Sequence, residues 1–191
     1  METQKKPKIL VFAASTRTGS YNEKLAAVAA RELRSAGMDV TLADLAEYAM
    51  PIYHGDTEAT EGLPDGARRF KELVREHDVL VVASPEYNGS LPALLKNTID
   101  WISRPDPGER SLAVLRGKLV ALLSASPGQG AGKRVLRYLR EWLELIGMKV
   151  VASQVNVAQA VEAFDESGNL VREEDRAAVS ALVDALVQAL G

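Results

Sequence analysis

Cysteine is absent from the 191 residues, and histidine occurs only twice. No disulfide framework, thiolate metal site or cysteine nucleophile is therefore available. His54 and His77 stand far apart without a ligand pattern such as H-E-x-x-H, which argues against a zinc enzyme and predicts no metal site. We interpret His54 as a loop residue and His77 as a residue near the end of a helix. Redox chemistry in this chain would need a cofactor.

Charge of one sign and long apolar runs are lacking as well. The 23 Lys and Arg residues are scattered, and against 26 Asp and Glu residues they give a net charge of −3. This balance provides no broad basic surface for nucleic acid or an anionic membrane. No segment approaches the roughly 20 apolar residues of a membrane span, and the opening METQKKPKIL lacks the apolar core of a signal peptide. We therefore predict a cytoplasmic protein that binds neither nucleic acid nor membrane.

The composition, with 47% hydrophobic and 26% charged residues, is typical of a globular protein. Its length suits a single domain over residues 1–191. Short continuous apolar runs alternate with amphipathic stretches, the pattern of buried parallel strands and their crossover helices. The predicted strands are 8–14, 38–42, 79–83, 118–123 and 149–157, and the predicted helices are 22–36, 65–77, 92–103, 133–146 and 173–189.

Five β-α units in alternation imply a parallel sheet with helices on both faces and right-handed crossovers. We predict an α/β fold, a flavodoxin-like doubly wound five-stranded parallel sheet. Such sheets bind ligands beyond the carboxyl ends of the strands, where the strand order reverses. The loops 13–22, 84–92 and 124–132 follow the first, third and fourth strands and are rich in Ser, Gly and Asn. A further loop, 51–64, is long enough to serve a site.

The first of these loops has the composition of a phosphate site. Four hydroxyl residues and Arg17 lie directly before a helix N-terminus, where free backbone N–H groups and the helix dipole favour an anion. The loop lacks both the G-K-[ST] ending of a P-loop and the G-x-G-x-x-G of dinucleotide sites. It therefore predicts a single terminal phosphate, as on a mononucleotide. The alternative, that the loop only caps its helix, stays open from this loop alone.

The second loop, S-P-E-Y-N-G-S, offers Tyr87 for stacking and backbone amides around Asn88 and Gly89. Taken alone, Tyr87 could be an ordinary aromatic residue at a strand end. The first loop reads A-S-T-R-T-G-S-Y-N, and the second continues into P-E-Y-N-x-S-x-P-x-x-L-K-N-x-I-D-W. Together they resemble the NADPH-dependent FMN reductase family, which includes quinone, chromate and azo-dye reductases. The resemblance extends from about Ile9 to Val161, with Ala14 where the family usually has Gly.

The resemblance implies a set of FMN-binding residues in all three loops. It implies that the FMN phosphate is bound by Ser15, Arg17, Ser20 and Asn22. It implies that the isoalloxazine ring is lined, largely through backbone groups, by Pro85, Glu86, Tyr87, Asn88 and Gly89. The third loop would contact the flavin through Ser124, Ser126, Pro127 and Gly128. No catalytic side chain is expected, because the chemistry takes place on the FMN.

The implied function is an FMN-dependent NAD(P)H oxidoreductase. NADPH or NADH would pass hydride through FMN to small electron acceptors, namely quinones, chromate, azo compounds or free flavin. Two alternatives stay open. One is a flavodoxin-like electron carrier that binds FMN without turning over NAD(P)H, although such carriers are usually more acidic than this chain. The other is a mononucleotide-sensing or interaction module, which would leave the Tyr87 loop unexplained.

The helix predicted at 92–103 bears on assembly. Its apolar residues span a wider arc than packing on a sheet requires, with Trp101 at the outer edge. Because the family commonly buries this region between subunits, we predict a homodimer or homotetramer. The alternative is a core helix whose apolar residues are all covered within one chain. The loop beyond it carries Arg104, Arg110 and Arg116, which could meet a neighbour's nicotinamide phosphate or an anionic acceptor, or could simply be solvated.

Overall fold

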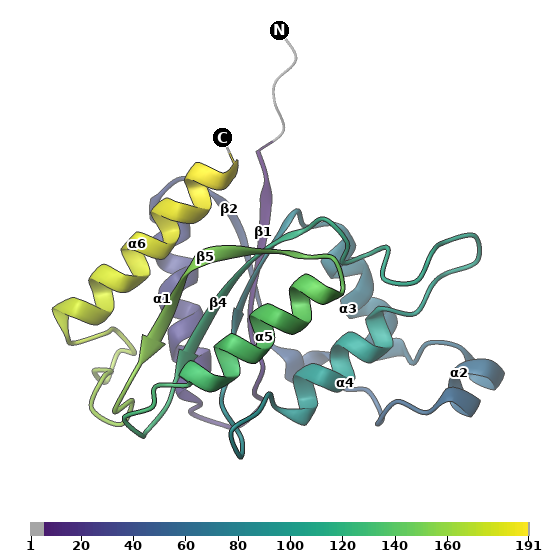
Figure 1. Ribbon diagram of the computed structural model, residues 1–191, viewed down its shortest axis with the longest axis horizontal. Coiled ribbons are helices and arrows are strands. Elements are labelled where there is room, and N and C mark those ends of the chain that lie inside the picture. Colours follow the sequence, from purple (N-terminus) through teal and green to yellow (C-terminus); the bar gives the residue numbers. More distant parts are fainter. Residues whose placement is uncertain (1–5, 191) are drawn as a thin grey trace, which may run out of the picture.

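The computed structural model describes residues 6–190. Five parallel strands form one sheet in the order β2-β1-β3-β4-β5 (Figure 1). The strands are β1 Lys8–Ala13, β2 Asp39–Ala43, β3 Val79–Ala83, β4 Leu119–Ala125 and β5 Lys149–Val157. Strand order reverses between β1 and β3, and the predicted doubly wound, flavodoxin-like fold is confirmed. The predicted single domain, 1–191, includes residues 1–5 and 191, which lie outside the described part.

Helices cover both faces of this sheet (Figure 1). One face carries α1 Tyr21–Ser35 and α6 Glu173–Leu190, and the other carries α3 Asp65–Arg75, α4 Ala93–Ile102 and α5 Lys133–Leu145. Along β1, Ile9 and Val11 pack in the first layer, whereas Leu10 and Phe12 pack in the second. Because side chains alternate along a strand, burial on both sides requires the continuous apolar run seen in the sequence.

The segment between β2 and α3 is more ordered than predicted. It contains a short 3-10 helix, η1 Leu45–Tyr48, and a short helix, α2 Gly55–Glu61. Each begins at a side-chain cap: the Asp44 carboxylate accepts from the Ala46 N–H at 2.8 Å, and His54 Nδ1 accepts from the Asp56 N–H at 3.3 Å. No residue of α2 is buried, so the sequence carries no apolar period that could reveal this helix.

His77 follows α3, as predicted, and serves the fold. It is buried, with Nδ1 at 2.6 Å from the Leu73 carbonyl and Nε2 at 2.8 Å from the Thr41 hydroxyl. Within residues 6–190, no helix has both the length and the apolar character needed to cross a membrane.

Trp101 does not lie on an outer edge of α4, and that prediction is wrong. The side chain is fully buried within the single chain, with its indole N–H donating to the Pro51 carbonyl at 2.8 Å and its ring 5.0 Å from that of Tyr53. Asn97 fixes the same segment, accepting from the Tyr53 N–H at 2.7 Å and donating to the Pro51 carbonyl at 2.8 Å. The edge of the apolar arc of α4 at Trp101 is therefore covered by residues 51–53 of the same chain.

Candidate functional site

The three loops singled out in the sequence meet in one cleft at the carboxyl ends of β1, β3 and β4. The cleft has a volume of about 270 Å³ and lies at the reversal of strand order. Its lining comprises Ser15, Arg17, Ser20, Tyr21, Asn22, Pro85, Glu86, Tyr87, Ala125, Ser126 and Pro127. The other predicted site residues, Asn88, Gly89, Ser124 and Gly128, lie in the same loops but do not line the cleft.

The start of α1 is open to an anion. Ser20 occupies the N-cap position, yet its side chain makes no capping hydrogen bond. The first N–H groups of a helix have no acceptor within the helix, so they remain available here. Ser15 and Ser20 are buried beside them, and Arg17 is exposed at the rim, donating to the Thr18 and Gly19 carbonyls at 3.2 and 3.1 Å. These groups fit a phosphate.

A neighbouring pocket of about 250 Å³ shares Ser15 but has the opposite electrostatic character. It lies between α1 and the carboxyl end of β2, and it contains the carboxyl groups of Glu23 and Asp44. Burial, followed by the nearby Asp44 carboxylate, raises the pKa of Glu23. Two carboxyl groups disfavour a phosphate, so the anion site is the cleft and not this pocket.

Asn22 fastens the phosphate loop to the sheet. Its side-chain amide donates to the Ala125 carbonyl at 3.0 Å, and its side-chain oxygen accepts from the Ala125 N–H at 2.9 Å. Both polar atoms of this buried side chain are thus used at the end of β4. The resemblance implied a contact between Asn22 and the FMN phosphate. The backbone N–H and the second N–H of the side-chain amide remain available for it, and this contact stays a prediction. The Asn22 side chain acts as a positioning group.

The loop after β3 forms a tight turn that exposes Tyr87. Tyr87 and Ser90 exchange two backbone hydrogen bonds of 3.0 Å, and the central residues Asn88 and Gly89 have φ values of 51° and 76°. Positive φ at both central residues defines a type I′ turn, which favours Asn-Gly. The Tyr87 side chain is 51% exposed beside the cleft, where it is available for stacking.

Glu86 links this turn to α5. One of its carboxylate oxygens accepts from the Val135 N–H at 3.2 Å, in the first turn of that helix. A carboxylate at a helix N-terminus satisfies a free donor and opposes the positive end of the helix dipole. Glu86 therefore holds the loop in place.

The loop after β4 closes over Ser124. This side chain is fully buried, and its hydroxyl has no hydrogen-bond partner within the described part of the chain. Gly132, with φ of 68°, approaches it so closely that a Cβ there would lie 1.9 Å from the Ser124 hydroxyl oxygen. Further along the loop, the Gly128 N–H donates to the Ser126 hydroxyl at 3.4 Å.

Sequence reasoning missed two lining residues, Tyr21 and Ala125. Tyr21 occupies the unspecified position between Ser20 and Asn22; its ring stacks on Phe164 at 6.3 Å and lies 5.6 Å from the Arg17 guanidinium. An aromatic residue at the first helical position beside a phosphate loop was the available signal. Ala125 contributes its backbone, for which the sequence carries no signal.

A doubly wound sheet with an open helix N-terminus after β1 and an exposed aromatic turn after β3 defines a flavodoxin-like, mononucleotide-binding class of protein. The hydroxyl groups, backbone amides and flat aromatic side chain around the cleft fit FMN. The family model for NADPH-dependent FMN reductase matches residues 7–162. The chain belongs to this family and is an FMN-dependent NAD(P)H oxidoreductase.

Individual relatives agree with this assignment. An NAD(P)H-dependent FMN reductase of Pseudomonas aeruginosa is 36% identical over 180 residues, covering 94% of this chain and 92% of the relative. An NAD(P)H:quinone oxidoreductase of Solanum tuberosum is 32% identical over 190 residues, covering 97% and 94%. Among solved structures, a flavoenzyme NAD(P)H:(acceptor) oxidoreductase of Paracoccus denitrificans superposes with a TM-score of 0.78 at 26% identity, covering 95% of this chain and 98% of that one. These similarities do not favour the electron-carrier alternative.

Proposed function

We propose that this protein uses FMN, held in the cleft between the 15–22, 85–89 and 124–128 loops, to reduce quinones and other small diffusible acceptors with NADPH or NADH. The observation that carries the proposal is the meeting of all three loops in one cleft at the switch point of the sheet. Relatives named quinone reductase and NAD(P)H:quinone oxidoreductase support quinones as acceptors. Because NAD(P)H is formed inside cells, we also propose a cytoplasmic location.

The residues of the cleft bind and orient the cofactor in this proposal. Ser15, Ser20, Arg17 and the first N–H groups of α1 hold the phosphate. The Pro85–Gly89 turn flanks the ring from one loop, and Ser126 and Pro127 flank it from the other. Backbone N–H groups in these loops stabilise negative charge on the ring. Bound FMN supplies the redox chemistry, taking two electrons from NAD(P)H and giving them to the acceptor.

Absorbance and steady-state kinetics test the proposal. The purified protein, supplied with FMN, should show a bound-flavin spectrum that bleaches under anaerobic NADPH, and it should oxidise NADPH with menadione. If one face of the flavin serves both substrates in turn, initial-rate plots at several menadione concentrations should be parallel. Intersecting lines would rule out the shared face. Bound flavin without NAD(P)H oxidation would instead indicate an electron carrier, and failure to bind FMN would contradict the proposal.

We propose further that the protein is a homodimer that uses the outer side of α5. Tyr138 and Leu145 are 40% and 83% exposed, with the half-buried Trp142 between them. Their i, i+4, i+7 spacing places these three side chains on one stripe of the helix. Exposed apolar stripes of this kind favour contact with another protein surface.

A further inference from the structure

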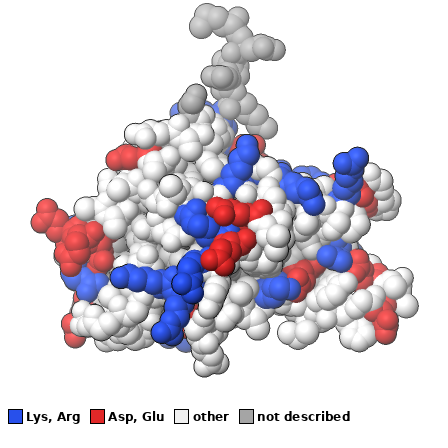
Figure 2. Space-filling view, in the orientation of Figure 1, with Lys and Arg blue, Asp and Glu red and all other residues white. Residues whose placement is uncertain are grey.

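Three cations at the start of α5 lack acidic partners. Lys133, Arg134 and Arg137 are exposed, and none forms an ion pair or a side-chain hydrogen bond within residues 6–190; the Arg137 guanidinium lies 5.2 Å from the centre of the Tyr138 ring. Arg140, on the same helix, forms an ion pair with Glu144 at 3.3 Å and donates to the Val151 carbonyl at 2.6 Å. Basic side chains gather over the N-terminal half of α5 (Figure 2). On a chain with a net charge of −3, this cluster is a local exception.

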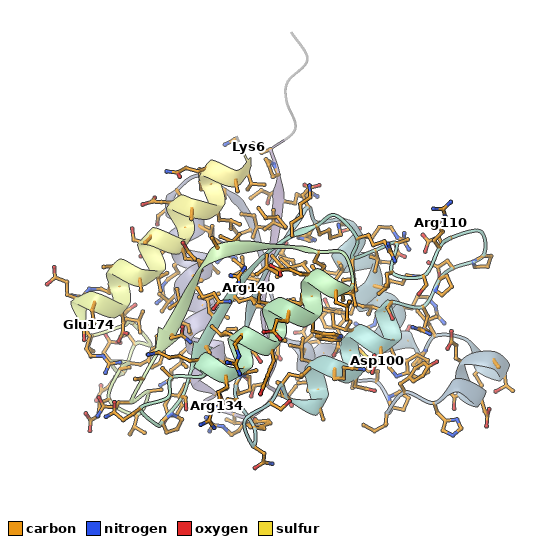
Figure 3. All side chains as sticks on the ribbon, viewed as in Figure 1. Lys6, Asp100, Arg110, Arg134, Arg140 and Glu174 are labelled. Carbon is orange, nitrogen blue, oxygen red and sulfur yellow. The ribbon has the colours of Figure 1, made fainter. Side chains whose placement is uncertain are left out.

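The cluster lies directly beside the cofactor cleft. The Arg134 Nη1 atom is 3.9 Å from the position that a Cβ of Gly89 would occupy, so its guanidinium lies against the Tyr87 turn. The bond from the Val135 N–H to Glu86 fastens the same turn to the first turn of α5. Figure 3 shows Arg134 at the N-terminal end of the helix. Arg134 thus lies at the rim of the cleft beyond Tyr87, and Lys133 and Arg137 lie beside it in the first turns of the same helix.

Unpaired like charges repel one another, and an anion of two or more charges relieves that repulsion. The helix end does not supply the binding groups here, because Glu86 already accepts from the Val135 N–H and opposes the dipole. The side chains themselves are therefore the anion-binding groups. The FMN phosphate already has its own site at the start of α1, so the cluster is free for a second anion.

NADPH brings such an anion, the phosphate on the 2′ position of its adenosine, and NADH lacks it. When the nicotinamide reaches the flavin ring, the adenosine half must leave the cleft over one of its rims. The rim next to α1 is occupied by the FMN phosphate and leads to a pocket with the carboxyl groups of Glu23 and Asp44. A phosphate is repelled there and attracted to the rim formed by α5.

We propose that Lys133, Arg134 and Arg137 bind the 2′-phosphate of NADPH and give the enzyme a preference for NADPH over NADH. The inference rests on the proposed function of the cleft. It assigns the preference to groups of the same chain, and not to the arginines of the 104–117 segment. Arg104 in that segment is already engaged, because its guanidinium donates to the Asp100 carbonyl and to the Ser103 hydroxyl, both at 3.1 Å.

Steady-state kinetics with menadione, a neutral acceptor, give the first test. In Arg134→Gln, KM for NADPH should rise about tenfold, the loss expected for one charge-assisted hydrogen bond at an exposed site, while KM for NADH stays unchanged. Replacing all three cations by Gln should bring the two KM values together. The matched control is Arg110→Gln, which removes an exposed arginine in the loop at the right of the molecule, away from Arg134 (Figure 3). A flavin spectrum identical to the parent's shows that each variant keeps its cofactor.

Calorimetric titration of the FMN-loaded protein gives a second test that does not depend on turnover. Adenosine 2′,5′-bisphosphate should bind more tightly than adenosine 5′-monophosphate. The triple variant should lose that difference, and added salt should weaken it, because the contact is ionic and exposed.

Unchanged KM values for NADPH in Arg134→Gln and the triple variant would overturn the inference while leaving the proposed function intact. It would also be overturned if Arg110→Gln alone raised KM for NADPH. A third contrary result would be variants in which KM for chromate, with NADH as donor, rises while KM for NADPH is unchanged. This result would assign the cluster to anionic acceptors. If the parent oxidised neither nucleotide, the proposed function would fail, and the bisphosphate titration would still decide whether the cluster recognises a 2′-phosphate.

Discussion

Among the described residues, Arg17 is the only cation in the lining of the cofactor cleft, and its guanidinium contacts carbonyl groups and one ring of its own loop and helix. Replacing it should therefore affect binding far more than folding. We expect Arg17→Ala to weaken FMN binding about thirtyfold, or about 2 kcal/mol, through loss of a charge-assisted hydrogen bond to the phosphate. Quenching of flavin fluorescence measures this. Riboflavin, which lacks the phosphate, should bind the parent poorly and be insensitive to the substitution. Equal FMN affinities would remove Arg17 from the site.

Gly132 is required by the close approach of the 124–132 loop to Ser124. In Gly132→Ala, the new methyl group would overlap the Ser124 hydroxyl in a backbone with φ of 68°. We expect the free energy of unfolding to fall by at least about 2 kcal/mol, as measured in urea.

Two other glycines serve as controls that separate backbone strain from steric overlap as causes of this loss of stability. Gly108→Ala shares a left-handed φ, 85°, but has open space around it, and should cost only about 1 kcal/mol of backbone strain. Gly130→Ala has open space and no left-handed φ, and should have little effect. If Gly132→Ala lowers the free energy of unfolding no more than Gly108→Ala does, the Ser124 side chain moves aside easily and the contact is not rigid.

At the scale of elements, an ion-pair network fastens α3 to the segment after α4. Lys71 is 1% exposed, and its ammonium group lies 2.6 Å from Asp106, 3.4 Å from Glu109 and 2.8 Å from the Arg104 carbonyl. Arg75 binds the same two carboxylates, at 2.8 and 2.5 Å. Because a buried ammonium group is costly without partners, the 104–109 segment must stay on α3.

This network should make stability sensitive to acid. The hydrogen bond from Arg75, aided by the Asp106 N–H, lowers the pKa of Glu109 from 4.5 to about 2. A carboxyl group with a lower pKa in the folded state stabilises the protein above its unfolded pKa and loses that contribution as pH falls. The urea midpoint should therefore decline from pH 4.5 towards 2, and Glu109→Gln should show a shallower decline. Glu61→Gln, in the exposed helix α2, should behave as the parent; identical profiles for Glu109→Gln and the parent would contradict the pairing.

At the scale of the whole molecule, the proposed homodimer predicts a mass of about twice 20.6 kDa in light scattering. Leu145→Glu should give the single-chain mass without unfolding, because a charge in the contact stripe disrupts the dimer and Leu145 is 83% exposed in one chain. Val161→Glu, another exposed apolar position at 65%, is the matched control. A parent with the mass of one chain, or a Leu145→Glu variant with the parent's mass, would contradict this interface. Trp101→Glu should instead unfold the protein, because Trp101 is fully buried within one chain and a carboxylate there would lack a partner.

The sequence was sufficient for the five strands and the main helices, because each strand is an apolar run and each helix that covers the sheet has an apolar face. It could not reveal α2, which has no buried residue, nor the burial of Trp101. A helical wheel counts apolar side chains but does not show what covers them, and the cover here is the 51–53 segment, almost fifty residues away.

For the site, the three loops could be found from their residue types and their place after strands, and most of the residues that line the cleft came from the resemblance of these loops to the FMN reductase family. The roles of Asn22 and Glu86 could not, because each bonds to a backbone group far along the chain. Polar side chains in a phosphate-type loop look like ligands until their partners are known. Here the partners are Ala125 and Val135, whose backbone groups leave no trace in the sequence.

The paired hydrogen bonds between Asn22 and Ala125 join the phosphate side of the cleft to its ring side across 103 residues of chain. The Ala125 amide proton can exchange with solvent only when α1 and β4 separate, so its exchange rate reports how often the cleft comes apart. Slow exchange in the protein without FMN would mean that the two loops are ordered by folding itself. The entropy lost in ordering the two loops would then be lost during folding and not during binding, so FMN would bind a site that is already assembled.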